Sequence, residues 1–184
     1  MKKLLLVFII AALVVKSAAA QQQSAAEVTF SFTRQGGTAS NQYAVWIEDA
    51  QGQYVKTLYA TRWTANGGWR RGEGRRAASI PVWVRQADVA NKSRTQIDAL
   101  TGATPRTGAL TYTWDGTNSV GAAVPNGEYV LLIEGSLRWE NHVLYRAPLR
   151  LGQAAATPAV RSEYAGDSTV ERSMISDVRV RTLR

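Results

Sequence analysis

Short segments with a two-residue hydrophobic period constrain the fold of this chain more than any other feature. In EVTFSFT, the apolar Val28, Phe30 and Phe32 alternate with polar residues, as in a strand with one buried face. The same alternation recurs in ALTYTW and ISDVRVRTLR, and Tyr43, Val45 and Ile47 share one face in QYAVWIED. YVKTLYATRW, EYVLLIEGSLRW and ENHVLYRAPLRLG are further candidate strands. Turn-forming residues separate these segments, and no segment shows a convincing amphipathic helical period. The chain therefore predicts an all-β fold, an antiparallel immunoglobulin-like β-sandwich.

Three other segments refine this prediction. SIPVWVRQ is predicted to be a short edge strand, because Pro81 has no N–H to donate to a neighbouring strand. Residues 153–172 are rich in alanine, threonine and serine, which predicts a loosely ordered connection. The loop at residues 64–78 carries Arg70, Arg71, Arg75 and Arg76, which predict either an anion-binding patch or an ordinary solvated loop.

We assign the six tryptophans to core packing.

The N-terminus has the plan of a secretory signal peptide. Lys2 and Lys3 precede an unbroken apolar run over residues 4–15, and the small residues 18–20 follow. The run is shorter than the roughly 20 residues that a membrane-spanning helix needs, so we expect no stable membrane insertion after cleavage. We therefore predict a signal peptide at 1–20, a spacer at 21–26 and a single domain at 27–184. The predicted compartment is the periplasm, reached by the general secretory route.

The absence of cysteine excludes several kinds of chemistry. No disulfide, thiolate nucleophile or thiolate metal site can form. The single histidine, His142, also excludes a multi-histidine metal site. Loss of the signal peptide removes three lysines and lowers the formal net charge from +8 to +5. A charge of this size suits acidic polymers or lipids, but because the protein is exported we expect no nucleic-acid partner.

A polar pair in RWENHVLY is the remaining candidate for catalysis. Glu140 and His142 lie two residues apart, so on a strand they point to the same face. They fit either an acid–base pair or a polar cluster that includes Arg138. No serine in a nucleophile elbow and no paired carboxylates accompany them, so we expect that the protein is not an enzyme.

The segment YTWDGTNSVGAAVPNGEYVLLIEG resembles the Trp-Asp-Gly, Gly-x-x-Val-Pro-x-Gly-x-Tyr pattern of the immunoglobulin-like domain of flagellar hook-cap proteins. In this pattern we expect Asp115 to bond the backbone ahead of it, and Gly121 and Gly127 to adopt positive φ. Together with AVWIED, TLYATRW, IPVW, DALTGATP and SLRWENHVLY, residues 27–152 resemble a bacterial family of predicted periplasmic proteins of unknown function. That resemblance implies a compartment and a fold, but no activity.

The segment DALTGAT resembles the target motif of an exported flavin transferase. This motif reads Asp-x-x-Ser/Thr-Gly-Ala-Ser/Thr, and its last hydroxyl carries FMN through a phosphoester. Every specified position is met, by Asp98, Thr101, Gly102, Ala103 and Thr104. The resemblance implies covalent FMN at Thr104, with Gly102 and Ala103 small enough for close approach. Asp98 would orient the loop or help a metal-bound phosphate to settle.

The same residues also predict a tight turn. Asp98 is suited to cap the residues after it, and Thr101 and Gly102 favour a bend. Two functions stay open. The first is a periplasmic FMN carrier, or an accessory to one, that serves the flavin transferase and membrane redox proteins. The second is a non-redox binding or structural module of the cell envelope. The first requires residues 98–104 to be accessible at the margin of the sandwich.

Overall fold

The computed structural model describes residues 24–36, 41–63, 79–137, 141–167 and 172–183. The predicted signal peptide and the arginine-rich residues 70–76 lie outside these ranges, as do Arg138 and Glu140. In the described ranges, no helix is long and apolar enough to cross a membrane.

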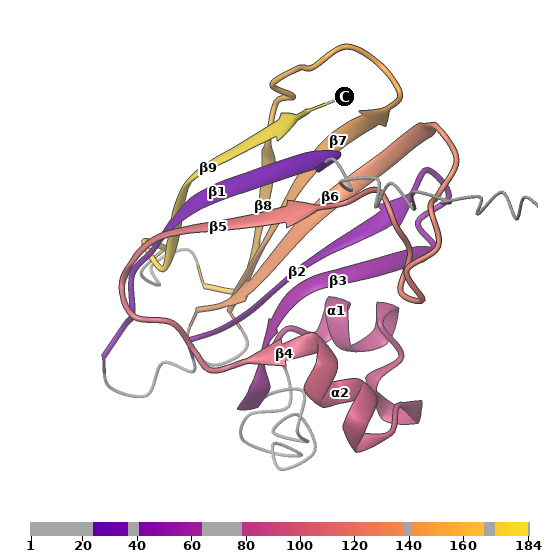
Figure 1. Cartoon of the computed structure of the whole chain (residues 1–184). Helices are drawn as coiled ribbons and strands as arrows, with labels where there is room; N and C mark the ends of the chain where they lie inside the picture. The colour runs from indigo at the N-terminus through magenta and orange to yellow at the C-terminus, as the bar shows by residue number, and fades with distance from the viewer. Residues whose placement is uncertain (1–23, 37–40, 64–78, 138–140, 168–171, 184) are drawn as a thin grey trace, which may run out of the picture.

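Two β-sheets stack face to face (Figure 1). In the smaller sheet, β1 (Ala26–Phe32) lies between β5 (Gly108–Trp114) and β9 (Ile175–Thr182). The larger sheet has the order β4-β3-β2-β6-β7-β8. Its strands are β2 (Gln42–Asp49), β3 (Tyr54–Thr61), β4 (Thr101–Gly102), β6 (Gly127–Ser136), β7 (His142–Leu151) and β8 (Arg161–Ala165). The pairs are antiparallel, apart from the short parallel pair of β3 and β4. The predicted all-β sandwich is therefore confirmed.

The core lies between the two sheets and follows from the two-residue period. Val28, Phe30 and Phe32 of β1 are buried there. Tyr43, Val45, Ile47, Leu131, Ile133, Val143 and Leu149 of the larger sheet are buried in the same cluster, as are Trp114, Ile175 and Val180 of the smaller sheet. Alternate side chains of a strand point to opposite faces, so the sequence of β1 places its apolar set inside the sandwich.

A second apolar cluster covers the outer face of the larger sheet, where two short helices pack. These are α1 (Pro81–Gln86) and α2 (Arg94–Leu100), which lie below β3 in the view of Figure 1. Trp46 of β2 and Trp83 of α1 are buried in this cluster. The prediction of an edge strand at SIPVWVRQ is thus wrong, and both helices form where the sequence shows no convincing amphipathic period. Pro81 begins α1 because the first helical position needs no N–H donor.

A buried carboxylate fixes α1 to the sheet. Glu134 of β6 is fully buried and accepts hydrogen bonds from the backbone N–H groups of Val82 (3.1 Å) and Trp83 (2.8 Å). These N–H groups belong to the first turn of the helix and have no partner within it. The Ile80 N–H, just before the helix, donates to Ser136 Oγ at 2.9 Å. Burial raises the pKa of Glu134, because the charged form loses its hydration, and the two backbone hydrogen bonds oppose that rise.

We expect Glu134→Gln to lower the free energy of unfolding by about 1–3 kcal/mol, because the amide NH₂ would face a backbone donor and leave it unsatisfied. The raised pKa means that folded Glu134 binds a proton more tightly than unfolded Glu134. Its contribution to stability is therefore complete below the unfolded pKa and is lost as the pH rises through the folded one. Chemical denaturation at about pH 5 and at about pH 8 measures this effect. The free energy of unfolding of the wild type should exceed that of Glu134→Gln by more at the lower pH. An advantage that grows with pH would contradict this assignment.

The turn predictions hold in part. Asp115 Oδ1 accepts a hydrogen bond from the Thr117 N–H at 3.1 Å, as expected. Gly121 has the predicted positive φ, at 80°, whereas Gly127 begins β6 and does not have a positive φ. Two boundaries also differ from prediction, because β1 begins inside the expected spacer at Ala26 and β8 lies inside the expected loose connection.

Candidate functional site

Residues 98–104 do not form the predicted turn, because a helix begins upstream of them. Ser93 is the N-cap of α2, and its Oγ accepts a hydrogen bond from the Gln96 N–H. The Gln96 side chain in turn accepts from the Ser93 N–H at 2.8 Å, which completes a capping box. Asp98 consequently lies within α2 and is not the cap that the turn interpretation required.

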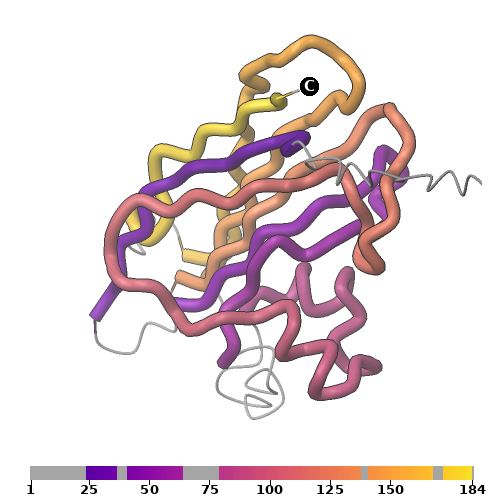
Figure 2. The backbone as a smooth tube through the Cα atoms, in the orientation of Figure 1, coloured from indigo at the N-terminus to yellow at the C-terminus, as the bar shows by residue number. Residues whose placement is uncertain are grey.

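After α2 the chain adds a short edge to the larger sheet and then crosses to the smaller one. Thr101 and Gly102 form β4, which pairs with the end of β3. Residues 103–107, which we call the connector, then lead from β4 to β5 (Figure 2). None of residues 98–104 is buried. The segment is accessible, as predicted, but the expectation that all of it is a connector is wrong, because residues 98–100 belong to α2.

Three of the five motif positions have a structural role. The Thr101 hydroxyl donates to the Ile97 carbonyl at 3.0 Å and so stabilises the end of α2. A Cβ atom on Gly102 would lie 2.7 Å from Cε2 of the Tyr59 ring, so a larger residue there would displace that ring. The Tyr59 hydroxyl donates to the Ala103 carbonyl at 2.5 Å. These contacts hold the middle of the motif against β3.

The other two motif residues, Asp98 and Thr104, are not used by the fold. Within the described part of the chain, neither side chain takes part in a hydrogen bond or an ion pair. Asp98 is exposed and Thr104 is partly exposed. A negative charge in the last turn of a helix also interacts unfavourably with the helix dipole, so α2 gains nothing from Asp98. The fold therefore does not depend on a hydrogen bond or an ion pair of either side chain among the described residues.

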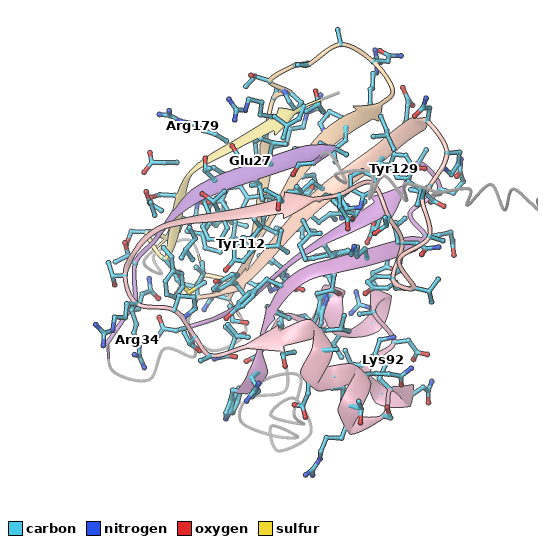
Figure 3. All side chains as sticks on the ribbon, viewed as in Figure 1. Glu27, Arg34, Lys92, Tyr112, Tyr129 and Arg179 are labelled. Atoms are coloured by element: carbon cyan, nitrogen blue, oxygen red, sulfur yellow. The ribbon has the colours of Figure 1, made fainter. Side chains whose placement is uncertain are left out.

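A cluster of tyrosines lies next to the connector. Tyr59 of β3 and Tyr112 of β5 come from different sheets, and their ring centroids lie 5.1 Å apart with an interplanar angle of 30°. Figure 3 labels Tyr112 on the side of β5 that faces β2 and β3. Both rings are partly exposed, and the buried Tyr43 stacks on Tyr59 at 5.3 Å. The Tyr43 and Tyr112 hydroxyls share a hydrogen bond of 2.5 Å. Burial raises the pKa of Tyr112 to about 12, so its hydroxyl is neutral at physiological pH.

Three exposed arginines surround the same region. Arg106 belongs to the connector, and Arg62 directly follows the β3 residue that pairs with Gly102. Burial raises the pKa of Tyr59, and the charge of Arg62 opposes this rise. The Arg34 N–H donates to Thr107 Oγ1 at 2.9 Å, which ties the end of β1 to the connector (Figure 3). Their guanidinium groups give this margin a positive charge that suits a phosphate.

Of the predicted Glu140–His142 pair, the structure describes only His142. His142 begins β7 opposite Ser136 of β6, whereas Glu140 lies outside the described residues. Among the residues that the structure describes, no group of three or more His, Cys, Asp or Glu side chains is placed to hold a metal ion.

Comparison with known proteins identifies one family. No curated protein and no solved structure matches the chain. No match shows the resemblance to flagellar hook-cap proteins, and none shows the resemblance of residues 98–104 to the flavin transferase motif. A family model described as "Predicted periplasmic protein (DUF2271)" matches residues 23–170, a range that includes residues 98–104. The chain therefore belongs to this family of predicted periplasmic proteins.

Proposed function

We propose that this protein is a periplasmic carrier of covalently bound FMN, exported by the general secretory route and attached to the cofactor at Thr104. One observation supports the proposal most. The fold fixes the middle of the motif, at Thr101, Gly102 and Ala103, but leaves the Asp98 carboxylate and the Thr104 hydroxyl unengaged. The contacts of the fold thus account for Thr101, Gly102 and Ala103, but not for Asp98 and Thr104.

The attachment is a phosphoryl transfer that an exported flavin transferase would perform. Thr104 Oγ attacks the phosphorus on the FMN side of flavin adenine dinucleotide, and a P–Oγ bond forms. The bond from that phosphorus to the bridging oxygen breaks, and AMP leaves. The hydroxyl proton passes to a base in the complex, and no electron is transferred. Gly102 and Ala103 favour this step, because their small size leaves space for an in-line approach.

The residues around Thr104 fit the group that they would hold. The exposed guanidinium groups of Arg62 and Arg106 offer positive charge to a phosphodiester. Tyr59 and Tyr112 offer partly exposed aromatic surface beside the connector. When bound, FMN supplies electron transfer, and the covalent bond prevents its loss outside the cytoplasm. The partners of such a carrier are membrane redox proteins that exchange electrons with it.

The decisive experiment is the mass of the exported protein, produced with and without a co-expressed flavin transferase. We expect the mature chain to gain the mass of one FMN less one water, only when the transferase is present. Trypsin cleaves after Arg94 and Arg106, so the modification should appear on the peptide of residues 95–106. Fragmentation of this peptide distinguishes Thr104 from Thr95 and Thr101. An unmodified chain, alongside a transferase that modifies a known target, would refute the proposal and leave the non-redox binding module.

A further inference from the structure

We infer that the Tyr59–Tyr112 pair is a docking surface for the isoalloxazine ring of FMN attached at Thr104. This inference rests on the proposed function and adds a second binding element to it. The covalent bond holds the phosphate, whereas the tyrosine pair would hold the ring at the other end of the cofactor.

The position of Tyr59 is the first argument. Its ring lies against Gly102, and its hydroxyl is bonded to the carbonyl of Ala103, the residue before Thr104. The backbone just before Thr104 therefore lies beside this ring. Tyr59 also fixes the backbone that presents Thr104, so the attachment point and the aromatic surface keep one geometry.

The rigidity of the pair is the second argument. Tyr112 reaches the site from β5 of the other sheet, and its ring packs on Phe30 with centroids 6.0 Å apart and planes 29° apart. Behind the pair, Tyr43 stacks on Tyr59 and is hydrogen-bonded to Tyr112. An aromatic surface that is already ordered loses little conformational entropy when a planar ligand stacks on it.

The charge of the pair is the third argument. The hydroxyls of Tyr59 and Tyr112 are protonated at physiological pH, because the ordinary pKa of tyrosine lies well above it and burial raises the pKa of both further. A neutral phenol does not repel an electron-rich ring, so the surface suits FMN before and after it accepts electrons. The arginines lie on the margin around the connector, where the phosphate would be, and the tyrosines form the apolar part.

Flavin emission and visible circular dichroism of the loaded protein test this inference. A tyrosine in contact with an isoalloxazine ring quenches its fluorescence, and a fixed ring acquires a dichroic signal. We expect Tyr112→Leu to raise the emission several-fold and to weaken the dichroism, and Tyr112→Phe to raise the emission but keep most of the dichroism. The matched control is Tyr164→Leu, because Tyr164 is 37 % exposed on β8, at the opposite edge of the larger sheet from β4. It should change neither signal.

Intact mass of the same samples separates this inference from the proposed function. If the wild type carries FMN and Tyr112→Leu leaves both signals unchanged, the docking surface is refuted and the attachment stands. If the wild type carries none, the proposed function itself fails. Tryptic release of the peptide of residues 95–106 gives a test that needs no variant. Emission should rise several-fold on release, and an emission that stays constant would also overturn the docking surface.

Discussion

The Thr104→Ala variant is expected to carry no covalent FMN, whereas Thr104→Ser retains it. Alanine has no oxygen to accept the phosphoryl group, and serine presents a hydroxyl from the same backbone position. Because the Thr104 hydroxyl forms no hydrogen bond within the described residues, both variants should unfold at the wild-type denaturant concentration. Intact mass and flavin fluorescence after denaturing electrophoresis measure the attachment, and equilibrium unfolding measures the stability.

Thr95→Ala is the matched control for this prediction. Thr95 is exposed in α2 and lies on the same tryptic peptide as Thr104, so its loss removes a neighbouring hydroxyl without altering the motif. We expect the control to be loaded like the wild type. Covalent FMN that persists in Thr104→Ala would place the attachment on another residue.

Local alternation explains why the strands were predictable. The two-residue period is a property of consecutive residues, and in β1 it directs Val28, Phe30 and Phe32 into the sandwich without reference to distant segments. The hairpin between β2 and β3 also depends on neighbouring residues alone, because Gly52 has a φ of 75° and its N–H donates to the Asp49 carbonyl.

The helices were missed for two different reasons. In α1, the residues PVWVRQ are too few to show a helical period, and distant groups stabilise the helix. Its first N–H groups bond to Glu134, and the Trp83 indole donates to Thr57. For α2 a local signal did exist, because Ser93 and Gln96 have the spacing of a capping box. Reading that box would have placed Asp98 in a helix.

The aromatic part of the candidate site could not be predicted from the sequence. Alternation places Tyr112 on the inner face of β5, but it does not reveal which strand of the other sheet lies opposite. Tyr59 and Tyr112 meet because β3 and β5 face each other across the side of the sandwich that the connector closes (Figure 1). The motif residues themselves were predictable, since they are consecutive and resemble a known target.

Asp98→Asn is expected to slow FMN attachment by about 100-fold without lowering the stability of the protein. The carboxylate is exposed, and no described residue bonds to it, so its removal breaks no contact. It lies in the last turn of α2, where a neutral side chain suits the helix dipole slightly better. In the complex with a transferase that we propose, the same carboxylate would assist the metal-bound phosphate that Thr104 attacks. Single-turnover rates with purified transferase measure the effect.

Asp88→Asn separates the role of Asp98 from the general loss of a negative charge. Asp88 is exposed just before a short 3-10 helix, η2 (Val89–Asn91), and its φ of 50° is one that asparagine also adopts. It lies outside the motif, so we expect a wild-type rate of attachment. If Asp98→Asn is loaded slowly but is as stable as the wild type, and Asp88→Asn is loaded at the wild-type rate, the Asp98 carboxylate serves the transferase reaction and not the stability of the fold. Equal rates in all three proteins would instead show that the transferase recognises the small residues after α2 without the carboxylate.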